Sequence, residues 1–316
     1  MSSSTLIRMG TSPRLSLMTS TSRRNILTIA PAAAVAGAAA VALPAPASAR
    51  TKRRANPHLD RALADLERQS SRKIAVTIGD GEHQLYSYRG TDPMPMCSLF
   101  KTILVGALLH DHAYDEAFWN QKITFTKGEV VVNSPICSAD ADGVMTVDEL
   151  ADAALRWSDN TAGNLLLRLY GGPAQLTAYA ASLGMRQTRL DRWEPELNTA
   201  IPGDLRDTST TNDMEKGFSD LLVGSALTQA GRARLRSWML RNQTSGKRLR
   251  ANLPATMELA DKTGAGDYGV VNDAGVYWSG EETLSIAVMT RASFAGAMND
   301  NTVVARIGQL AVQHYL

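Results

Sequence analysis

The chain has 316 residues, of which 44% are hydrophobic and 20% are charged. It is long enough to bury a substantial core, in one large domain or in two smaller ones. The formal net charge is +2, and residues 1–49 hold four arginines and no acid, which leaves −2 for the remainder. A body so close to neutral lacks the basic footprint of a nucleic-acid-binding protein.

The first 49 residues are typical of an export signal. SRRNIL at residues 22–27 resembles a twin-arginine motif, an alanine-rich apolar stretch covers residues 26–43, and ASA at residues 47–49 fits a cleavage site. An uncleaved membrane anchor is the alternative, because the stretch approaches spanning length. Pro31 and the weakly hydrophobic alanines favour a signal. We predict a secreted, periplasmic or cell-envelope protein without stable membrane association, whose start codon is Met1, Met9 or Met18.

The mature chain alternates between strand, helix and strand patterns. Asn56 and Pro57 begin an amphipathic helix, and residues 73–78 and 84–88 are predicted strands. Helices are then predicted over residues 98–110, 147–157, 161–170, 173–183, 211–223 and 228–241, with a charged loop over residues 192–207. Strands follow over residues 257–262, 270–278 and 283–290, and a helix over residues 302–315 closes the chain.

This order predicts an α/β fold with an inserted helical part. Residues 50–90 and 242–316 are expected to form one α/β domain, and residues 91–241 a helical domain inserted between its early and late strands. Ligands favour such domain junctions.

Two segments fit the pattern S-x-x-K, and one of them is placed to supply a nucleophile. Ser98-Leu99-Phe100-Lys101 precedes an apolar run at residues 102–109 that indicates a buried helix. At the start of a helix, positions i and i+3 share a face, so Lys101 can reach Ser98 and serve as the base that a serine needs. The other match, at residues 70–73, lies between a helix and a strand, and we interpret it as a solvated linker.

Two tripeptides complete a known combination. Ser158-Asp159-Asn160 lies between two helices and alone is typical of a helix N-cap. Lys262-Thr263-Gly264 is placed at the end of a predicted strand and alone indicates only an exposed cation. With S-x-x-K before them, in this order, the three motifs are the signature of class A β-lactamases and penicillin-binding proteins.

The chain resembles a class A β-lactamase over nearly its whole mature length. The further motifs lie 60, 96 and 164 residues after Ser98, as in that family. Residues 192–198, RWEPELN, resemble the family's Ω-loop motif E-x-x-L-N and supply Glu194 and Asn198. The resemblance implies an ion pair between Arg192 and Asp207 across the neck of this loop. It also implies the family fold, an antiparallel sheet flanked by helices with an inserted all-helical domain.

The resemblance implies a hydrolase that opens the β-lactam amide through an acyl-enzyme. Ser98 would attack the carbonyl, and its N–H with that of Ala265 would form the oxyanion hole. Either Lys101 or Glu194, through a water, would be the acylation base. Ser158 would pass a proton to the lactam nitrogen.

Further residues would bind the substrate or activate the deacylating water. The expected substrate-binding residues are Asn160, Asn198, Thr263, Gly264, Ala265 and Arg248. Asn160 would bind the side-chain amide, Thr263 the carboxylate, and Lys262 would supply positive potential. Glu194 and Asn198 would position the hydrolytic water. We expect a monomer that acts on β-lactams and needs no metal or organic cofactor.

Three positions depart from the pattern of many family members. Val271 stands where many have a substrate-binding arginine, and Arg248 fits the alternative of actinobacterial-type enzymes. Asn133 stands where an aromatic residue often lines the cleft mouth. These departures bear on substrate affinity more than on mechanism.

The two cysteines do not match the family's disulfides. Cys97 lacks a partner because Gly266 occupies the bridging position, and the positions of the other common bridge hold Val105 and Ala151. We therefore predict that Cys97 and Cys137 are free thiols, with Cys97 buried behind the nucleophile.

Two other functions share parts of this pattern. A D,D-peptidase shares the nucleophile, the lysine and the K-T-G strand, but it lacks the Ω-loop acid that Glu194 supplies here. A non-catalytic penicillin-binding sensor could lose the lysine or the acid, and both are present. Turnover of the chromogenic cephalosporin nitrocefin distinguishes the three.

Overall fold

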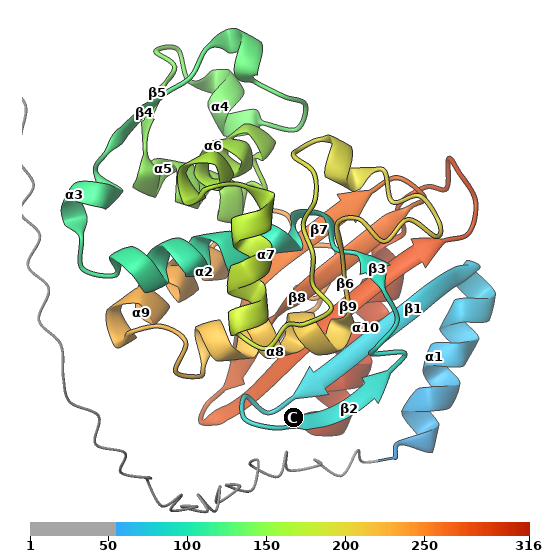
Figure 1. Cartoon of the computed structure of the whole chain (residues 1–316). Coiled ribbons are helices and arrows are strands. Elements are labelled where there is room, and N and C mark those ends of the chain that lie inside the picture. The colour runs from blue at the N-terminus through green and yellow to red at the C-terminus, as the bar shows by residue number, and fades with distance from the viewer. Residues whose placement is uncertain (1–54) are drawn as a thin grey trace, which may run out of the picture. The chain divides into compact units, whose positions relative to one another are not determined.

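The helices and strands of the chain follow the order that the sequence predicts (Figure 1). The computed structural model describes residues 55–316, so the predicted signal at residues 1–49 lies outside the described residues. The strands of the main sheet are β1 (Arg72–Gly79), β2 (Gln84–Tyr88), β7 (Met257–Gly266), β8 (Val270–Ser279) and β9 (Glu282–Ala292). The longer helices are α1 (Pro57–Ser70), α2 (Phe100–His112), α5 (Val147–Arg156), α6 (Asn160–Tyr170), α7 (Pro173–Ser182), α8 (Thr211–Leu222), α9 (Gln229–Leu240) and α10 (Asn301–Tyr315).

Shorter elements fill the connections between them. They are β3 (Met94–Pro95), β4 (Lys122–Thr124), β5 (Val144–Thr146), β6 (Thr208–Ser209), α3 (Glu116–Trp119), α4 (Pro135–Ala139) and 3₁₀ helices at Cys97–Leu99, Lys127–Glu129 and Glu196–Asn198. The sequence did not predict β4, β5, α3 or α4, because elements of three to five residues are too short to show a periodicity.

The main sheet is antiparallel and has the strand order β2-β1-β9-β8-β7. The early strand β1 pairs with the late strand β9 along its whole length, with Val76 opposite Val288. The expected class, an antiparallel sheet flanked by helices, is confirmed. The division into an α/β domain and an inserted helical domain stays a prediction.

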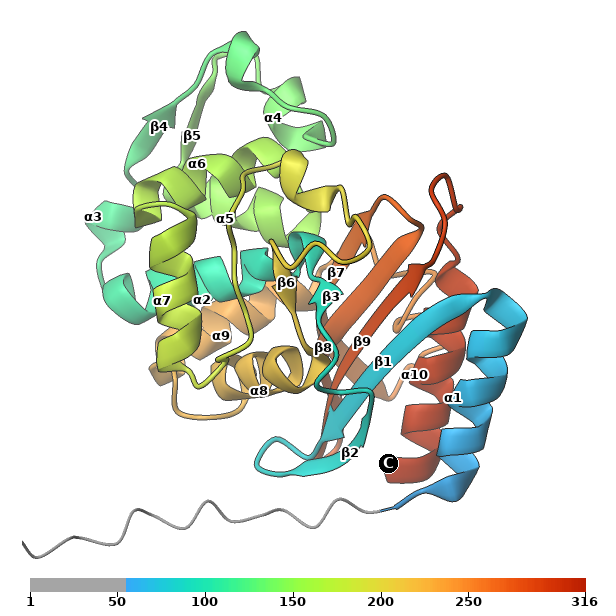
Figure 2. The same ribbon diagram turned by 45° about the vertical axis from the view of Figure 1, so that its right-hand side comes forward.

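One face of the sheet is covered by the helices from the two ends of the described chain. Figure 2 shows α1 and α10 side by side on this face. Asn56 caps α1 by accepting a hydrogen bond from the Leu59 N–H at 3.1 Å. Leu59 of α1 and Ile307 of α10 pack with Ile74 and Ile286 of the sheet in one buried cluster. This core joins sequence segments that lie more than two hundred residues apart.

The other face of the sheet packs against the helical part. Four of its side chains are small, with Ala75, Ala260, Ala274 and Ala287 all buried in the second cluster. Small residues allow α8 and α9 to approach the strands closely.

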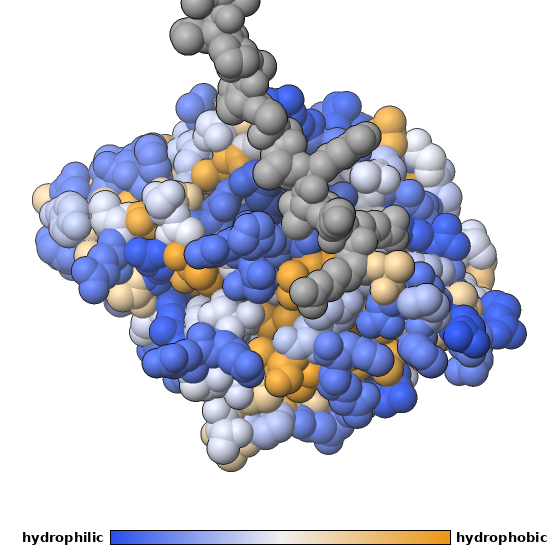
Figure 3. Space-filling view, turned by 90° about the horizontal axis from the view of Figure 1, so that it is seen from below, coloured by the Kyte–Doolittle hydropathy of each residue, from blue (hydrophilic) through white to orange (hydrophobic). Residues whose placement is uncertain are grey.

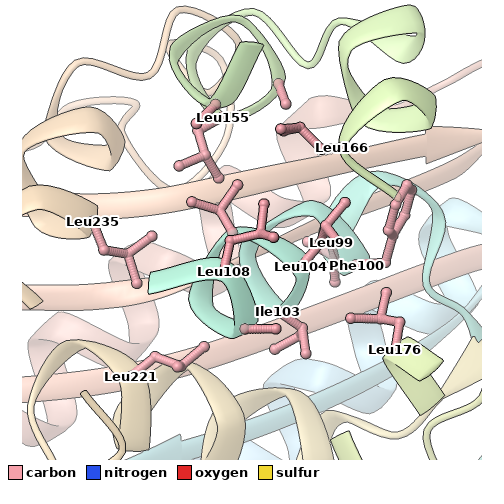
Figure 4. Close-up of a cluster of buried hydrophobic side chains, with 14 of the residues drawn as sticks. Leu99, Phe100, Ile103, Leu104, Leu108, Leu155, Leu166, Leu176, Leu221 and Leu235 are labelled. Carbon is pink, nitrogen blue, oxygen red and sulfur yellow. The ribbon is translucent and has the colours of Figure 1, made fainter. Parts of the chain in front are cut away.

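Helix α2 lies at the centre of the second cluster. Residues 100–109 are all buried, which explains why this stretch is apolar on every side. Figure 4 shows Ile103, Leu104 and Leu108 of α2 among leucines from the surrounding helices. The nucleophile motif is therefore built on one of the least mobile elements of the fold.

The K-T-G motif lies inside a strand, which corrects the prediction that it ends one. Strand β7 continues to Gly266, with Gly264 opposite Asn272 and Gly266 opposite Val270 of β8. The glycines lower the intrinsic strand propensity, but pairing with β8 outweighs it. Gly264 is also required sterically, because a Cβ there would lie 2.9 Å from the Met96 carbonyl oxygen.

On the side that Figure 3 shows, hydrophilic residues predominate and hydrophobic ones form small, separate patches. Among residues 55–316, no helix combines the length and the apolar character that crossing a bilayer requires.

A buried acid on α8 gives the fold a pH dependence. Glu215 is 6% exposed, and Ser285 of β9 donates to its Oε1 at 2.5 Å. Burial raises the pKa of Glu215 to about 7, the hydrogen bond from Ser285 opposes the rise, and smaller effects of Asp220 and Asp80 add to it while Lys216 opposes it. A folded-state pKa above the unfolded value means that stability is fully present below the unfolded pKa and is lost as pH rises through about 7.

We predict that Glu215→Gln stabilises the protein at alkaline pH. Glutamine keeps an acceptor for Ser285 and removes the buried charge. The free energy of unfolding at pH 8 should rise by on the order of 3 kcal/mol, and the gain should vanish near about pH 4. Denaturant melts across this range measure it, with the exposed Glu281→Gln as control. Equal gains at both ends of the range would contradict the prediction.

Candidate active site

The nucleophile lies in a turn that is held from two sides. Ser98 belongs to the 3₁₀ helix Cys97–Leu99, immediately before α2. Asn272 of β8 donates to the Pro95 carbonyl oxygen at 2.8 Å, and the Met96 N–H donates to the Asp207 carbonyl oxygen at 3.0 Å. Cys97 adopts a φ of +48°, in the left-handed region that costs energy for a residue with a side chain. The surrounding contacts hold this strained turn in place.

Lys101 is completely buried beside Ser98. Its Nζ donates to the Ser98 Oγ at 3.0 Å, to the Ser158 carbonyl oxygen at 2.8 Å and to the Asn160 Oδ1 at 2.8 Å. The Glu194 Oε1 lies 3.1 Å from the same nitrogen. Removing an ammonium from water is costly unless it is paired and hydrogen-bonded. The four oxygens therefore explain how the lysine is tolerated there.

The S-D-N motif is both a helix cap and a part of the site. Asp159 caps α6 by accepting from the Ala162 N–H at 2.9 Å, and its other oxygen accepts from the backbone of α4. This cap fixes the two flanking residues, Ser158 and Asn160, which face Lys101. The motif therefore has two roles. Asp159 caps the helix, and its neighbours Ser158 and Asn160 contact Lys101.

Strand β7 brings a second buried lysine to the site. Lys262 donates from Nζ to the Ser158 Oγ at 2.9 Å and to the Thr263 carbonyl oxygen at 2.8 Å. Burial lowers the pKa of Lys262 well below its usual value, and the neighbouring cations Lys101 and Arg248 lower it further.

Two buried acids lie close behind Lys262. Asp261 accepts hydrogen bonds from Asn242 and Arg250. Burial and the Asp261 carboxylate raise the pKa of Asp273 well above its usual value.

The Ω-loop brings the acid to the nucleophile. Arg192 and Asp207 form the predicted ion pair at its neck, with Nε and Oδ2 2.5 Å apart. Glu194 is 2% exposed, and its Oε1 lies 3.2 Å from the Ser98 Oγ. Asn198 donates from Nδ2 to the Glu194 Oε2.

Sequence reasoning missed Asn164, which holds Glu194 in place. Its Oδ1 accepts from the Glu194 N–H and its Nδ2 donates to the Glu194 carbonyl oxygen, both at 2.9 Å. Asn164 lies on α6, four residues after Asn160, so the two side chains share one face of the helix. The four-residue spacing from Asn160 is the signal in the sequence that could have pointed to Asn164. It does not identify the partner, Glu194, which reaches Asn164 only because the Ω-loop packs against α6.

The predicted residues meet around one cavity of about 610 Å³. Its lining residues are Ser98, Asn133, Ser134, Pro135, Ser138, Trp157, Ser158, Asn160, Asn198, Thr244, Arg248, Thr263, Ala265 and Asn299. Lys101, Glu194 and Lys262 lie behind this wall, in contact with its serines. Gly264 lies in β7 between Thr263 and Ala265, where its carbonyl oxygen accepts from Arg248. Val271 is buried in the core behind the sheet and does not line the cavity.

The second S-x-x-K segment is structural. Ser70 donates to the Leu66 carbonyl oxygen at the end of α1, and Lys73 pairs with Asp92 at 2.8 Å. Neither side chain lines the cavity that holds Ser98.

The prediction of two free thiols is confirmed. Cys97 packs with Ala200 and Val270 in a small apolar cluster, and burial raises the pKa of its thiol. A Cβ at Gly266 would lie 2.9 Å from the Cys97 Sγ, so the expected bridging position does face this cysteine.

Known proteins are similar to this chain in sequence and in fold. A model described as the β-lactamase enzyme family matches residues 58–315. The chain belongs to the β-lactamase enzyme family. It is 40% identical to β-lactamase AST-1 of Nocardia asteroides, over 80% of this chain and 82% of that one. It is 41% identical to a β-lactamase of Streptomyces lavendulae, over 92% and 95% of the two chains.

A solved structure agrees with these relatives. The β-lactamase of Streptomyces albus G superposes with a TM-score of 0.77 at 41% identity, over 81% of this chain and 99% of that one. The predicted membership of the class A β-lactamases is confirmed, and the chain is a hydrolase of β-lactam amide bonds.

We predict that Asn164→Ala loosens the Ω-loop of this β-lactamase. The change removes two hydrogen bonds and leaves the Glu194 N–H and carbonyl unpaired, at a cost of about 1–3 kcal/mol. Thermal melts and limited proteolysis should show a lower Tm and faster cleavage within residues 192–207. Asn164→Asp keeps the acceptor for the Glu194 N–H but sets an oxygen against the Glu194 carbonyl oxygen, so it should not restore the loop. An alanine variant with unchanged cleavage would contradict the prediction.

Proposed function

We propose that this class A β-lactamase is an exported enzyme that hydrolyses penicillins and related antibiotics through an ester on Ser98. The Ser98 Oγ lies at hydrogen-bond distance from two candidate bases, Lys101 at 3.0 Å and Glu194 at 3.2 Å. Glu194 as the carboxylate, or Lys101 once it has given up a proton and is a neutral amine, can take the hydroxyl proton as the oxygen attacks the carbonyl carbon. The backbone N–H groups of Ser98 and Ala265 would stabilise the developing oxyanion.

Ser158 is the proposed proton donor to the lactam nitrogen. Its Oγ lines the cavity and accepts a hydrogen bond from Lys262. That bond leaves the Ser158 hydroxyl hydrogen free to point into the cavity. Breaking the amide bond requires a proton on the leaving nitrogen.

The observation that carries the proposal is the environment of Glu194 and Asn198. The Asn198 Oδ1 is buried and has no hydrogen-bond partner among the described residues, while its Nδ2 is bound to Glu194. A buried amide oxygen needs a donor. A water held by this oxygen and by Glu194 would face the ester carbon on Ser98, with its base already in contact. This arrangement supports hydrolysis of the acyl-enzyme.

Substrate binding is assigned to the polar wall of the cavity. Arg248 donates from Nη1 to the carbonyl oxygens of Gly264 and Asn272, and from Nε to the Asn301 Oδ1. No described residue receives a hydrogen bond from its Nη2, and Arg248 lines the cavity. We assign this nitrogen and Thr263 to the substrate carboxylate.

Asn160, Asn198 and Ala265 complete the proposed binding wall. Asn160 is held between Lys101 and the Val132 carbonyl oxygen, which would orient its amide toward the substrate side chain. Gly264 keeps β7 close to the nucleophile turn. The wall is complete within one chain, which supports a monomer.

The proposal of export rests on residues 1–49. Their twin-arginine-like motif, apolar stretch and cleavage pattern support secretion, or release into the periplasm or cell envelope. Hydrolysis outside the cytoplasm would destroy β-lactams before they reach cell-wall enzymes, and so confer resistance.

A D,D-peptidase and a penicillin-binding sensor are the competing functions. Both would stop at the acyl-enzyme with a β-lactam, because they lack a positioned water and base. The buried Glu194, in contact with both Asn198 and Ser98, favours a hydrolase.

We predict that Glu194→Ala stalls the reaction after acylation. Without the base for the water, a covalent adduct on Ser98 should accumulate, visible by intact-protein mass spectrometry. Steady-state turnover of benzylpenicillin should fall by at least about 10²-fold.

Two control variants define the outcome. Ser98→Ala should form no adduct, and Glu196→Ala, which removes an exposed carboxylate two residues away, should keep normal turnover. Wild-type turnover by Glu194→Ala would refute the assignment of the Ω-loop acid.

We predict that Arg248→Ala weakens recognition of the substrate carboxylate. The kcat/KM for benzylpenicillin should fall. The corresponding loss of transition-state stabilisation should be about 1–3 kcal/mol, the range for a hydrogen bond to a charged group. The adjacent, exposed Lys247→Ala is the control for general charge effects. An unchanged kcat/KM would assign the carboxylate to Lys262 and Thr263 alone.

A further inference from the structure

Among residues 55–316, Trp157 is the one aromatic side chain in the wall of the catalytic cavity. The other lining residues are polar except for Pro135 and Ala265. Trp157 is 39% exposed, and of the eight large hydrophobic side chains exposed among residues 55–316 it alone lines this cavity. An exposed indole in a polar pocket offers a flat apolar surface of the kind that ligands use.

The backbone on both sides of Trp157 is fixed. Its N–H donates to the Ala153 carbonyl oxygen at 3.1 Å, at the end of α5. The Gln243 N–H donates to the Arg156 carbonyl oxygen at 2.9 Å, and the following Asp159 is fully buried. The indole is therefore presented by a rigid segment, so that a contact with it costs little ordering of the protein.

The position of Trp157 indicates which part of the substrate it meets. Ser158, the next residue, is the proposed proton donor to the lactam nitrogen. The second ring of a β-lactam antibiotic is bonded to that nitrogen, so this ring and its substituents lie on the Ser158 side of the cavity. Thr244, whose hydroxyl is hydrogen-bonded to that of Thr263, lines the same cavity.

We propose that Trp157 is a specificity-determining residue that binds a flat aromatic substituent on the second ring, such as the C3 substituent of a cephalosporin. Stacked or edge-to-face aromatic contacts would form without a counter-charge. The inference rests on the proposed function, because it uses Ser158 as the proton donor. It adds a substrate preference, for aromatic over small C3 groups, that the hydrolytic residues do not themselves determine.

Two cephalosporins provide a matched test. Nitrocefin and cephalothin carry the same thienylacetyl side chain and differ at C3, where the first has a dinitrostyryl group and the second an acetoxymethyl group. In Trp157→Ala, the kcat/KM for nitrocefin should fall roughly ten-fold relative to wild type. The kcat/KM for cephalothin should change by less than about two-fold.

Two further variants keep the test decisive. Trp157→Phe retains an aromatic face and should preserve the wild-type ratio of the two kcat/KM values within about three-fold, even if the alanine variant folds poorly. Tyr114→Ala removes an exposed aromatic ring outside the cavity and should leave both values unchanged. Thermal melts of each variant report on folding.

The outcomes separate three explanations. A selective loss with nitrocefin supports the proposal. An equal loss with both substrates would mean that Trp157 only supports Ser158, and no loss with either would mean no contact; each overturns it. A wild-type enzyme that turns over neither substrate, whether or not an adduct forms on Ser98, would overturn the proposed function, and this inference with it.

Discussion

The site depends on one constraint, the burial of the Lys101 ammonium. A cation without solvent must be surrounded by oxygens. Those oxygens come from the nucleophile turn, the S-D-N loop, α6 and the Ω-loop. Because the S-D-N loop runs directly into α6, satisfying one lysine brings three separate segments of the chain to one point. The arrangement that stabilises Lys101 also places the Ser98 Oγ between Lys101 and the Glu194 carboxylate.

The second buried lysine extends this arrangement to the sheet. Lys262 binds the Ser158 hydroxyl, so β7 is connected to the same loop that binds Lys101. Burial and the neighbouring Lys101 and Arg248 lower the pKa of Lys262, and the acids Asp261 and Asp273 lie behind β7. In the proposed binding mode, the β-lactam carboxylate would bring a negative charge to Lys262 from the cavity side.

Much of the fold followed from local patterns. The long helices and the five strands of the sheet were predicted within a few residues, because their periodicity and caps are encoded locally, as with Asn56 and the Thr146–Glu149 capping box. The strand end at Lys262 was wrong because cross-strand pairing with β8, which is not local, carries β7 on to Gly266. Asn164 was missed for the same kind of reason, since its partner lies thirty residues away on the Ω-loop.

The sequence by itself determined the chemistry. Serine, lysine and glutamate are chemically suited to acyl transfer and hydrolysis wherever they meet, and the spacing of their motifs matched one family. Tertiary structure decided which serine and lysine could act together, because Ser70 and Lys73 share the S-x-x-K pattern but bind other partners. It also decided which residues face the substrate. Exposure is a property of packing, and only the folded chain turns Trp157 into the cleft and Val271 into the core.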